Sequence, residues 1–169
     1  MENQATSKSS LQIVRRFNAP QSLVFKAFAS QEAFAEWWGP SGSQLTLINF
    51  DFREGGVTHY RLDSGGMVMW ALFRYREIRQ PDSITFISAF ADAGGNIRTS
   101  PFPFDFPLEV HNNITLTETG GVTTLKLYAE PVDATPEQEK TFRELNASMN
   151  QGYEGTFKQL DTYLLKLQG

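Results

Sequence analysis

The chain has 169 residues, of which 40% are hydrophobic and 20% charged, a balance typical of one globular domain. Its formal net charge of −4 argues against a nucleic-acid-binding surface, and the lack of cysteine excludes disulfides, thiolate metal sites and a cysteine nucleophile. Aromatic residues make up 13% of the chain, which indicates an interior lined by rings.

The first ten residues are polar, so we expect a disordered tail over residues 1–10 and no secretory signal. The longest apolar run, Met67–Phe73, is too short to span a membrane. We therefore expect a cytoplasmic protein without a membrane span, and one domain over residues 11–169.

Alternating apolar positions predict a first strand at Leu11–Phe17. Asn18–Pro20 favours the start of a helix, and Ser30 the start of a second short helix that ends at Gly39–Pro40. From residue 45 to residue 130, β-forming stretches alternate with glycine-rich or proline-containing turns. This pattern predicts about six further strands in an antiparallel sheet.

The end of the chain predicts a long helix. Thr135–Gln138 is a capping-box pattern with Pro136 at the first helical position. From Phe142 to Leu167, apolar residues recur every three or four positions, and such a stripe needs a sheet to cover. The predicted fold is α+β: a curved antiparallel sheet of about seven strands wrapped around a long C-terminal helix, with two short helices after the first strand.

Local motifs then occur in a familiar order, and they cover most of residues 11–167. They are RRFNAP at 15–20, WWGP at 37–40, DFREGG at 51–56, Trp70 and YREI at 75–78, Pro81, Phe86 and Gly152. With them the chain resembles the SRPBCC (START-like, helix-grip) superfamily, and within it the bacterial relatives of the activator of heat-shock protein 90 ATPase. It departs at Tyr153, where the family often has Trp. The resemblance implies a helix-grip fold with a hydrophobic cavity between the sheet and the long helix.

We expect aromatic and neighbouring helix residues to line this cavity, although rings also simply fill cores. The candidates are Trp37, Trp38, Tyr60, Trp70, Tyr75, Phe86, Phe90, Met149, Gly152 and Tyr153. Gly152 and Gly155 interrupt an otherwise good helix, and Gly152 shares a face with Met149. We expect the space beside Gly152 to be occupied, so that a side chain there would overpack.

Two further features suggest contacts at the cavity. Arg15 falls among the inward-facing positions of the first strand, where a guanidinium needs a partner such as Asp161 or an anionic ligand group. It is therefore a candidate polar anchor. Phe102, Phe104 and Phe106 alternate with prolines in a long irregular segment. We expect this loop to be either a lid over the cavity or a contact with a second copy in a homodimer.

The sequence offers little for catalysis. His59 and His111 are the two histidines, too few for a metal site without cysteine, and neither a nucleophile motif nor a phosphate-binding loop occurs. We assign no catalytic residue, metal or cofactor, and predict binding of a small hydrophobic or aromatic molecule, with no nucleic-acid partner. Two alternatives stay open: an aromatase/cyclase-like enzyme that folds a polyketide-type substrate, and a chaperone-interacting regulator. The second is disfavoured, because one domain uses up the whole chain.

Overall fold

The computed structural model describes residues 9–40 and 42–168. The strands are Leu11–Phe17 (β1), Gln44–Phe50 (β2), Val57–Ser64 (β3), Met67–Arg79 (β4), Ser83–Phe90 (β5), Val110–Thr119 (β6) and Val122–Pro131 (β7). The helices are Gln21–Ala29 (α2), Gln31–Trp37 (α3), Pro136–Glu144 (α4) and Asn146–Gln168 (α5).

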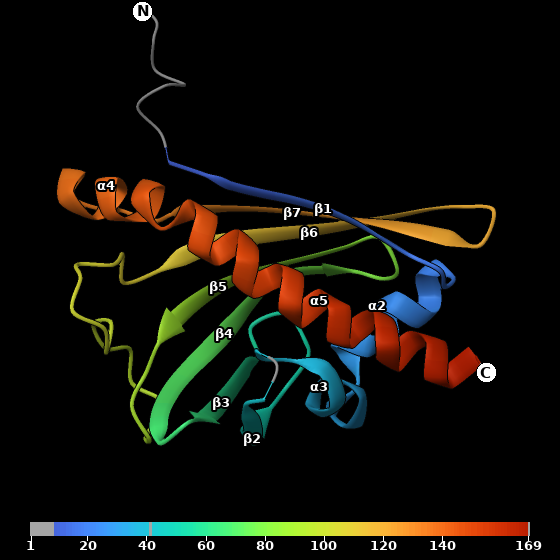
Figure 1. Ribbon diagram of the computed structural model, residues 1–169, viewed down its shortest axis with the longest axis horizontal. Coiled ribbons are helices and arrows are strands. Elements are labelled where there is room, and N and C mark those ends of the chain that lie inside the picture. Colours follow the sequence, from blue (N-terminus) through green and yellow to red (C-terminus); the bar gives the residue numbers. More distant parts are fainter. Residues whose placement is uncertain (1–8, 41, 169) are drawn as a thin grey trace, which may run out of the picture.

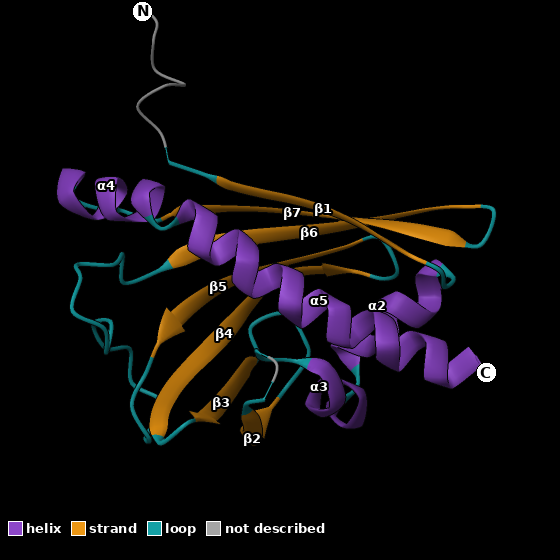
Figure 2. Ribbon diagram, viewed as in Figure 1, coloured by secondary structure: helices purple, strands orange, loops and turns teal. Residues whose placement is uncertain are grey.

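The seven strands form one sheet in the order β1-β7-β6-β5-β4-β3-β2, and every neighbouring pair is antiparallel. The sheet curves, and α5 runs diagonally across it while α2 and α3 lie near the C-terminal half of α5 (Figure 1). The longest stretch without a helix or strand joins β5 to β6 over residues 91–109 (Figure 2). The predicted α+β helix-grip fold is confirmed.

The expected helix starts are present in part. Ser30 caps α3 by accepting the Ala33 N–H at 3.3 Å. At α4, Thr135 and Gln138 form a complete capping box, with side-chain bonds of 3.1 and 3.0 Å. Helix α2 differs, because Pro20 caps it without a side-chain bond and a remote carboxylate, Glu118, accepts the Gln21 N–H at 2.7 Å.

The predicted single C-terminal helix is two helices. Leu145 leaves helical geometry with φ −90° and ψ 1°, and α5 starts at the next residue. The two helices pack on different clusters: Phe142 of α4 lies with Leu11, Val110 and Ala129, whereas α5 packs on the main core. One straight stripe does not reach both surfaces, so the chain bends between them.

Residues 9 and 10 are ordered, unlike the disordered tail predicted for them. Residues 1–8 lie outside the described residues, but Ser9 is buried against α4. Its N–H and hydroxyl donate to Glu139 at 3.2 and 2.8 Å, and Asn146 donates to the Ser10 carbonyl at 2.9 Å. Residues 9 and 10 are therefore tethered, because α4 offers acceptors and donors to a backbone that precedes β1.

The main core lies between the inner face of the sheet and the helices α2, α3 and α5. Cross-strand partners share a face, so Tyr60 opposite Ala71 and Ala71 opposite Phe90 form one inward row across β3, β4 and β5. Within residues 9–40 and 42–168, no helix is both long and apolar enough to cross a membrane.

Candidate functional site

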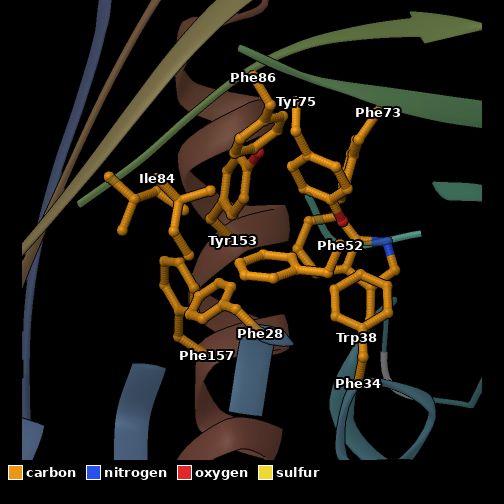
Figure 3. A pocket seen from close by; sticks show the side chains of 11 residues that line it. Phe28, Phe34, Trp38, Phe52, Phe73, Tyr75, Ile84, Phe86, Tyr153 and Phe157 are labelled. Atoms are coloured by element: carbon orange, nitrogen blue, oxygen red, sulfur yellow. The ribbon is translucent and has the colours of Figure 1, made fainter. Parts of the chain in front are cut away.

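The rings between the middle of the sheet and the helices form what we call the packed region (Figure 3). Its residues are Phe28, Phe34, Phe52, Phe73, Tyr75, Ile84, Phe86, Ile114 and Phe157, with Trp38 and Tyr153 at its border. The space left among them is about 10 Å³, no more than one water molecule needs. Tyr75 and Phe86 therefore belong to a filled core, and the prediction that they line a cavity is wrong.

Close tilted and edge-on ring contacts explain why the packed region is full. The ring centroids of Phe73 and Phe86 lie 4.5 Å apart, and those of Phe73 and Trp38 5.2 Å apart. Among these rings, the Tyr75 hydroxyl has a hydrogen-bond partner, because it lies 2.7 Å from Thr58 Oγ1. Burial raises the pKa of Tyr75 to about 12, so this hydroxyl stays neutral.

Beyond Trp38 the interior is open. An inner compartment of about 210 Å³ lies between β3, β4, β5 and α5, and the end of the β5–β6 loop at Phe106–Pro107 covers it. Tyr60, Ala71 and Phe90 line its floor. The short side chain of Ala71 stands between two rings, so the row across the sheet leaves room that a larger residue would fill.

An outer compartment of about 380 Å³ continues toward the surface. It is lined by the turn at Gly39–Pro40, by Leu62 and Phe102, and by Met149, Gly152 and Thr156. The two compartments share Trp38, Tyr60, Met69 and Tyr153, and we call them together the open pocket. No lining residue of either compartment carries a charge.

The turn that carries Trp38 is fixed from both sides. Its backbone N–H closes α3 on the Phe34 carbonyl at 3.1 Å. From α5, the Gln159 amide donates to the carbonyls of Trp37, at 3.2 Å, and Gly39. Gly39 has φ +107°, and a Cβ there would lie 2.8 Å from Leu62 Cδ2, so this position requires glycine.

Three ring-borne polar groups border the open pocket. The indole N–H of Trp38 is buried without a hydrogen-bond partner in the described part of the chain. Burial raises the pKa of Tyr60 above its usual range, and the neighbouring indole of Trp38 offsets this in part. Burial alone raises the pKa of Tyr153 to about 12, and Figure 3 shows its hydroxyl directed into the protein, toward Phe86. Both tyrosines therefore keep their protons at neutral pH.

A fourth polar group, Ser88 of β5, lines the inner compartment. Its Oγ accepts a hydrogen bond of 3.0 Å from the Asn112 amide. Asn112 is buried on β6, opposite Phe86, and also donates to the Val110 carbonyl at 3.0 Å. The serine is thereby held on the inner face of the sheet.

The two remaining tryptophans lie outside the open pocket, and both predictions are wrong. Trp37 is buried among α2, α3 and α5, and its indole donates to the Ala27 carbonyl at 3.0 Å. Trp70 points to the outer face of the sheet, because it stands at an even position of β4 opposite Arg61. There it packs against His59, with ring centroids 5.7 Å apart. His59 is further tied to the Asp92 carbonyl at 3.0 Å.

Arg15 also lies elsewhere. It lines a separate polar groove between β1 and α5 with Glu154 and Lys158, and its guanidinium lies 5.5 Å from the centroid of the Phe17 ring. Its inward direction was predicted correctly, but it does not reach the open pocket. The Arg15 guanidinium therefore lies over the Phe17 ring, and not beside the carboxylate of Asp161 that the sequence suggested as its partner.

The β5–β6 loop contributes two of its three phenylalanines. Phe102 lines the outer compartment and Phe106 the inner one, whereas Phe104 is 38% exposed and stacks on Phe102 at 5.6 Å. Gly152 lines the outer compartment but is exposed, and a Cβ there would meet nothing within 4 Å. The prediction that the space beside Gly152 is filled is therefore wrong.

Of the predicted residues, Trp38, Tyr60, Phe90, Met149, Gly152 and Tyr153 line the open pocket. Sequence reasoning did not indicate the rest of the lining or the residue that holds Ser88. These are Gly39, Pro40, Leu62, Met69, Ala71, Phe73, Ser88, Ala89, Pro107, Val110 and Thr156, with Asn112 behind Ser88. Odd positions of β4 share the face of Phe73, so strand alternation could have indicated Met69 and Ala71.

Comparisons with known proteins agree with this architecture. Residues 18–165 match the family model of the Activator of Hsp90 ATPase homolog 1-like proteins. A solved protein from Arthrobacter aurescens is similar with a TM-score of 0.78 and 22% identity, over 98% of this chain and 90% of that one. A protein from Mycobacterium smegmatis has a TM-score of 0.77 and 23% identity, over 93% of this chain and 91% of that one. The AHSA1 protein from Silicibacter pomeroyi has a TM-score of 0.71 and 18% identity, over 95% of this chain and 100% of that one. The curated proteins give no match. These likenesses show the shared fold, and the match over most of its length shows that the chain belongs to the Activator of Hsp90 ATPase homolog 1-like family.

Proposed function

We propose that the protein binds a small, uncharged, hydrophobic or aromatic molecule in the open pocket. The observation that carries this proposal is the inner compartment, about 210 Å³ of space lined largely by rings and other apolar side chains, beside a packed region with almost no space. Ligand sites are typically concave and apolar with a few placed polar groups, which describes Tyr60, Ser88 and Tyr153 among their neighbours. The lack of lining charges disfavours an ionic ligand, whose charge would be buried unpaired.

The β5–β6 loop is in this proposal the cover of the pocket rather than a contact with a second copy. Phe102 and Phe106 both pack on Phe90, with centroid distances of 6.0 and 5.8 Å. Phe106 also contacts Phe142 of α4 at 5.8 Å. Phe102 and Phe106 thus pack against other residues of the same chain, on the side of the loop that faces the open pocket.

The polar groups favour binding over acid–base catalysis. A general base works best with a pKa near the working pH, whereas the pKa of Tyr153 is raised to about 12 and that of Tyr60 is also raised. At neutral pH both hydroxyls can donate hydrogen bonds but cannot accept protons readily. This argues against either tyrosine acting as a general base, and it leaves the hydroxyls the role of hydrogen-bond donors to a bound molecule.

Tryptophan fluorescence provides the test, because Trp38 borders the ligand space. A panel of bicyclic aromatic ketones, sterols, medium-chain alcohols and the matching carboxylates is titrated into the protein. We expect saturable quenching by at least one uncharged class, and binding of the carboxylates at least tenfold weaker. Absence of quenching by every member, or tighter binding of the carboxylates, would refute the proposal.

A variant that fills the compartment separates specific binding from nonspecific adsorption. Ala71→Phe places a ring in the inner compartment, and we expect it to abolish quenching. Val68→Phe adds a ring to the same strand but on its outer face, where Val68 is 46% exposed. It is the matched control and should bind as the unchanged protein does.

A further inference from the structure

The direction of one hydrogen bond in the inner compartment is fixed by the backbone. The Asn112 amide nitrogen faces the carbonyl oxygens of Val110 and Phe86, at 3.0 and 3.5 Å. Carbonyl oxygens only accept, so this end of the amide is the NH₂ group and it donates to Ser88 at 3.0 Å. The Ser88 oxygen is therefore an acceptor in this bond, and its own proton is available to the compartment.

A second donor points at the tyrosine side of the pocket. An indole N–H can only donate, and that of Trp38 is buried without a partner in the described part of the chain. The ring of Tyr60 lies edge-on to it with centroids 6.3 Å apart, and the indole acts on the Tyr60 oxygen as a nearby donor. A small rotation of either ring would let the Trp38 N–H donate to the Tyr60 oxygen. The Tyr60 O–H group would then remain free to donate into the pocket.

We propose that the inner compartment selects molecules that carry an uncharged hydrogen-bond acceptor, such as a carbonyl oxygen, which accepts hydrogen bonds from the hydroxyl groups of Ser88 and Tyr60. This inference rests on the proposed function and specifies its ligand class. The Ser88 oxygen accepts from the Asn112 amide, and the Tyr60 oxygen lies near the Trp38 indole N–H, which can only donate. Each hydroxyl therefore has its own O–H group free to donate to a ligand. A ligand with only hydrogen-bond donors would find few free lone pairs on these two oxygens. A ligand without polar atoms would bury both hydroxyl groups without a hydrogen-bond partner, which costs binding free energy.

A pair of near-isosteric probes tests the acceptor. 2-Acetylnaphthalene carries a carbonyl oxygen where 2-isopropenylnaphthalene carries a CH₂ group. Binding is followed by the ¹H–¹⁵N signals of the three tryptophan indoles, with Trp38→Phe identifying the Trp38 signal. The two probes are hydrated differently in water, so the informative quantity is the change in the ratio of their dissociation constants between variants.

Removal of one donor should weaken the ketone alone. For Tyr60→Phe and Ser88→Ala we expect about three- to tenfold weaker binding of 2-acetylnaphthalene. Binding of 2-isopropenylnaphthalene should change less than about twofold. In the unchanged protein the Trp38 indole signal should shift more with the ketone than with 2-isopropenylnaphthalene. A Tyr60 hydroxyl that donates to the ketone becomes a better acceptor for the Trp38 indole N–H.

Tyr75→Phe is the matched control. It removes a tyrosine hydroxyl of the same sheet whose partner is Thr58 in the packed region, and it should leave the ratio unchanged. If both probes bind and neither Tyr60→Phe nor Ser88→Ala changes the ratio, the acceptor proposal is wrong while the proposed function stands. If neither probe binds, both proposals fail for molecules of this size.

Discussion

The packed region and the open pocket lie next to each other beneath α5 and are lined by the same kind of ring, yet only the second holds space, about 210 Å³ in its inner compartment against about 10 Å³. In the packed region, rings of the sheet meet rings of the helices, as Phe73 meets Phe34 at 6.1 Å. In the open pocket, Ala71 separates the rings of the sheet and Gly152 contributes no side chain from α5. Small residues on the sheet and on α5, rather than aromatic content, therefore mark where this fold is hollow.

The largest contrast is expected from truncation of one inward residue in each region. Phe34→Ala should lower the free energy of unfolding by about 3–5 kcal/mol, because its ring is buried and contacts four other rings. Met69→Ala borders existing space and should cost less than about 1.5 kcal/mol. Urea unfolding of both variants measures this. Equal losses would mean that the two regions do not differ in packing.

The second prediction concerns alkaline pH, where the two regions should behave alike. Burial raises the pKa of Tyr75 in the packed region and of Tyr153 in the open pocket to about 12, against about 10 in an unfolded chain. Below pH 10 both states are protonated and the stabilisation is complete. Between about pH 10 and 12 the unfolded chain has released protons that the folded chain retains, so stability falls as pH rises.

Urea midpoints measured from pH 8 to pH 12 check this dependence. We expect a constant midpoint to about pH 9.5 and a fall above it, shallower in both Tyr75→Phe and Tyr153→Phe. A fall that only Tyr75→Phe makes shallower would show that water reaches Tyr153, and the open pocket would then be wet rather than apolar.

A third prediction tests the turn that separates the two regions. Gly39→Ala forces a side chain into φ +107° and against Leu62, and should cost about 1–3 kcal/mol while displacing Trp38. Gly42→Ala has a similar φ of +85° but no neighbour within 4 Å, so it measures the backbone strain alone. Thermal unfolding and the near-ultraviolet circular dichroism of the tryptophans report both effects. Equal losses in the two variants would remove the role assigned to the Leu62 contact.

Much of this architecture could be predicted from local patterns. Alternation in the strands, the capping box at Thr135 and the apolar stripe of α5 each depend on neighbours in sequence. The face of Trp70 was also predictable, since an even position cannot share a face with Tyr75 in an uninterrupted strand.

Other features depend on partners that no local pattern indicates. The start of α2 is satisfied by Glu118, 97 residues away, and the Trp38 turn by Gln159 from α5. Which of two adjacent tryptophans reaches the pocket depends on where α3 ends, because Trp37 is its last residue and Trp38 is extended. The hollow itself is a property of residues that face each other across the fold.

The smallest expected effect concerns Gly152, and its sign distinguishes open space from filled space. A Cβ at Gly152 would meet nothing within 4 Å, and the same holds for Gly155 one turn further along α5. Gly→Ala in a helix interior gains up to about 1 kcal/mol where the new methyl group meets no obstacle. Gly152→Ala and Gly155→Ala should therefore both raise the melting temperature by similar amounts. Gly152 lines the outer compartment and Gly155 does not, so only Gly152→Leu should also weaken ligand binding. A loss of stability in Gly152→Ala alone would mean that something, such as the β5–β6 loop in solution, occupies the outer compartment.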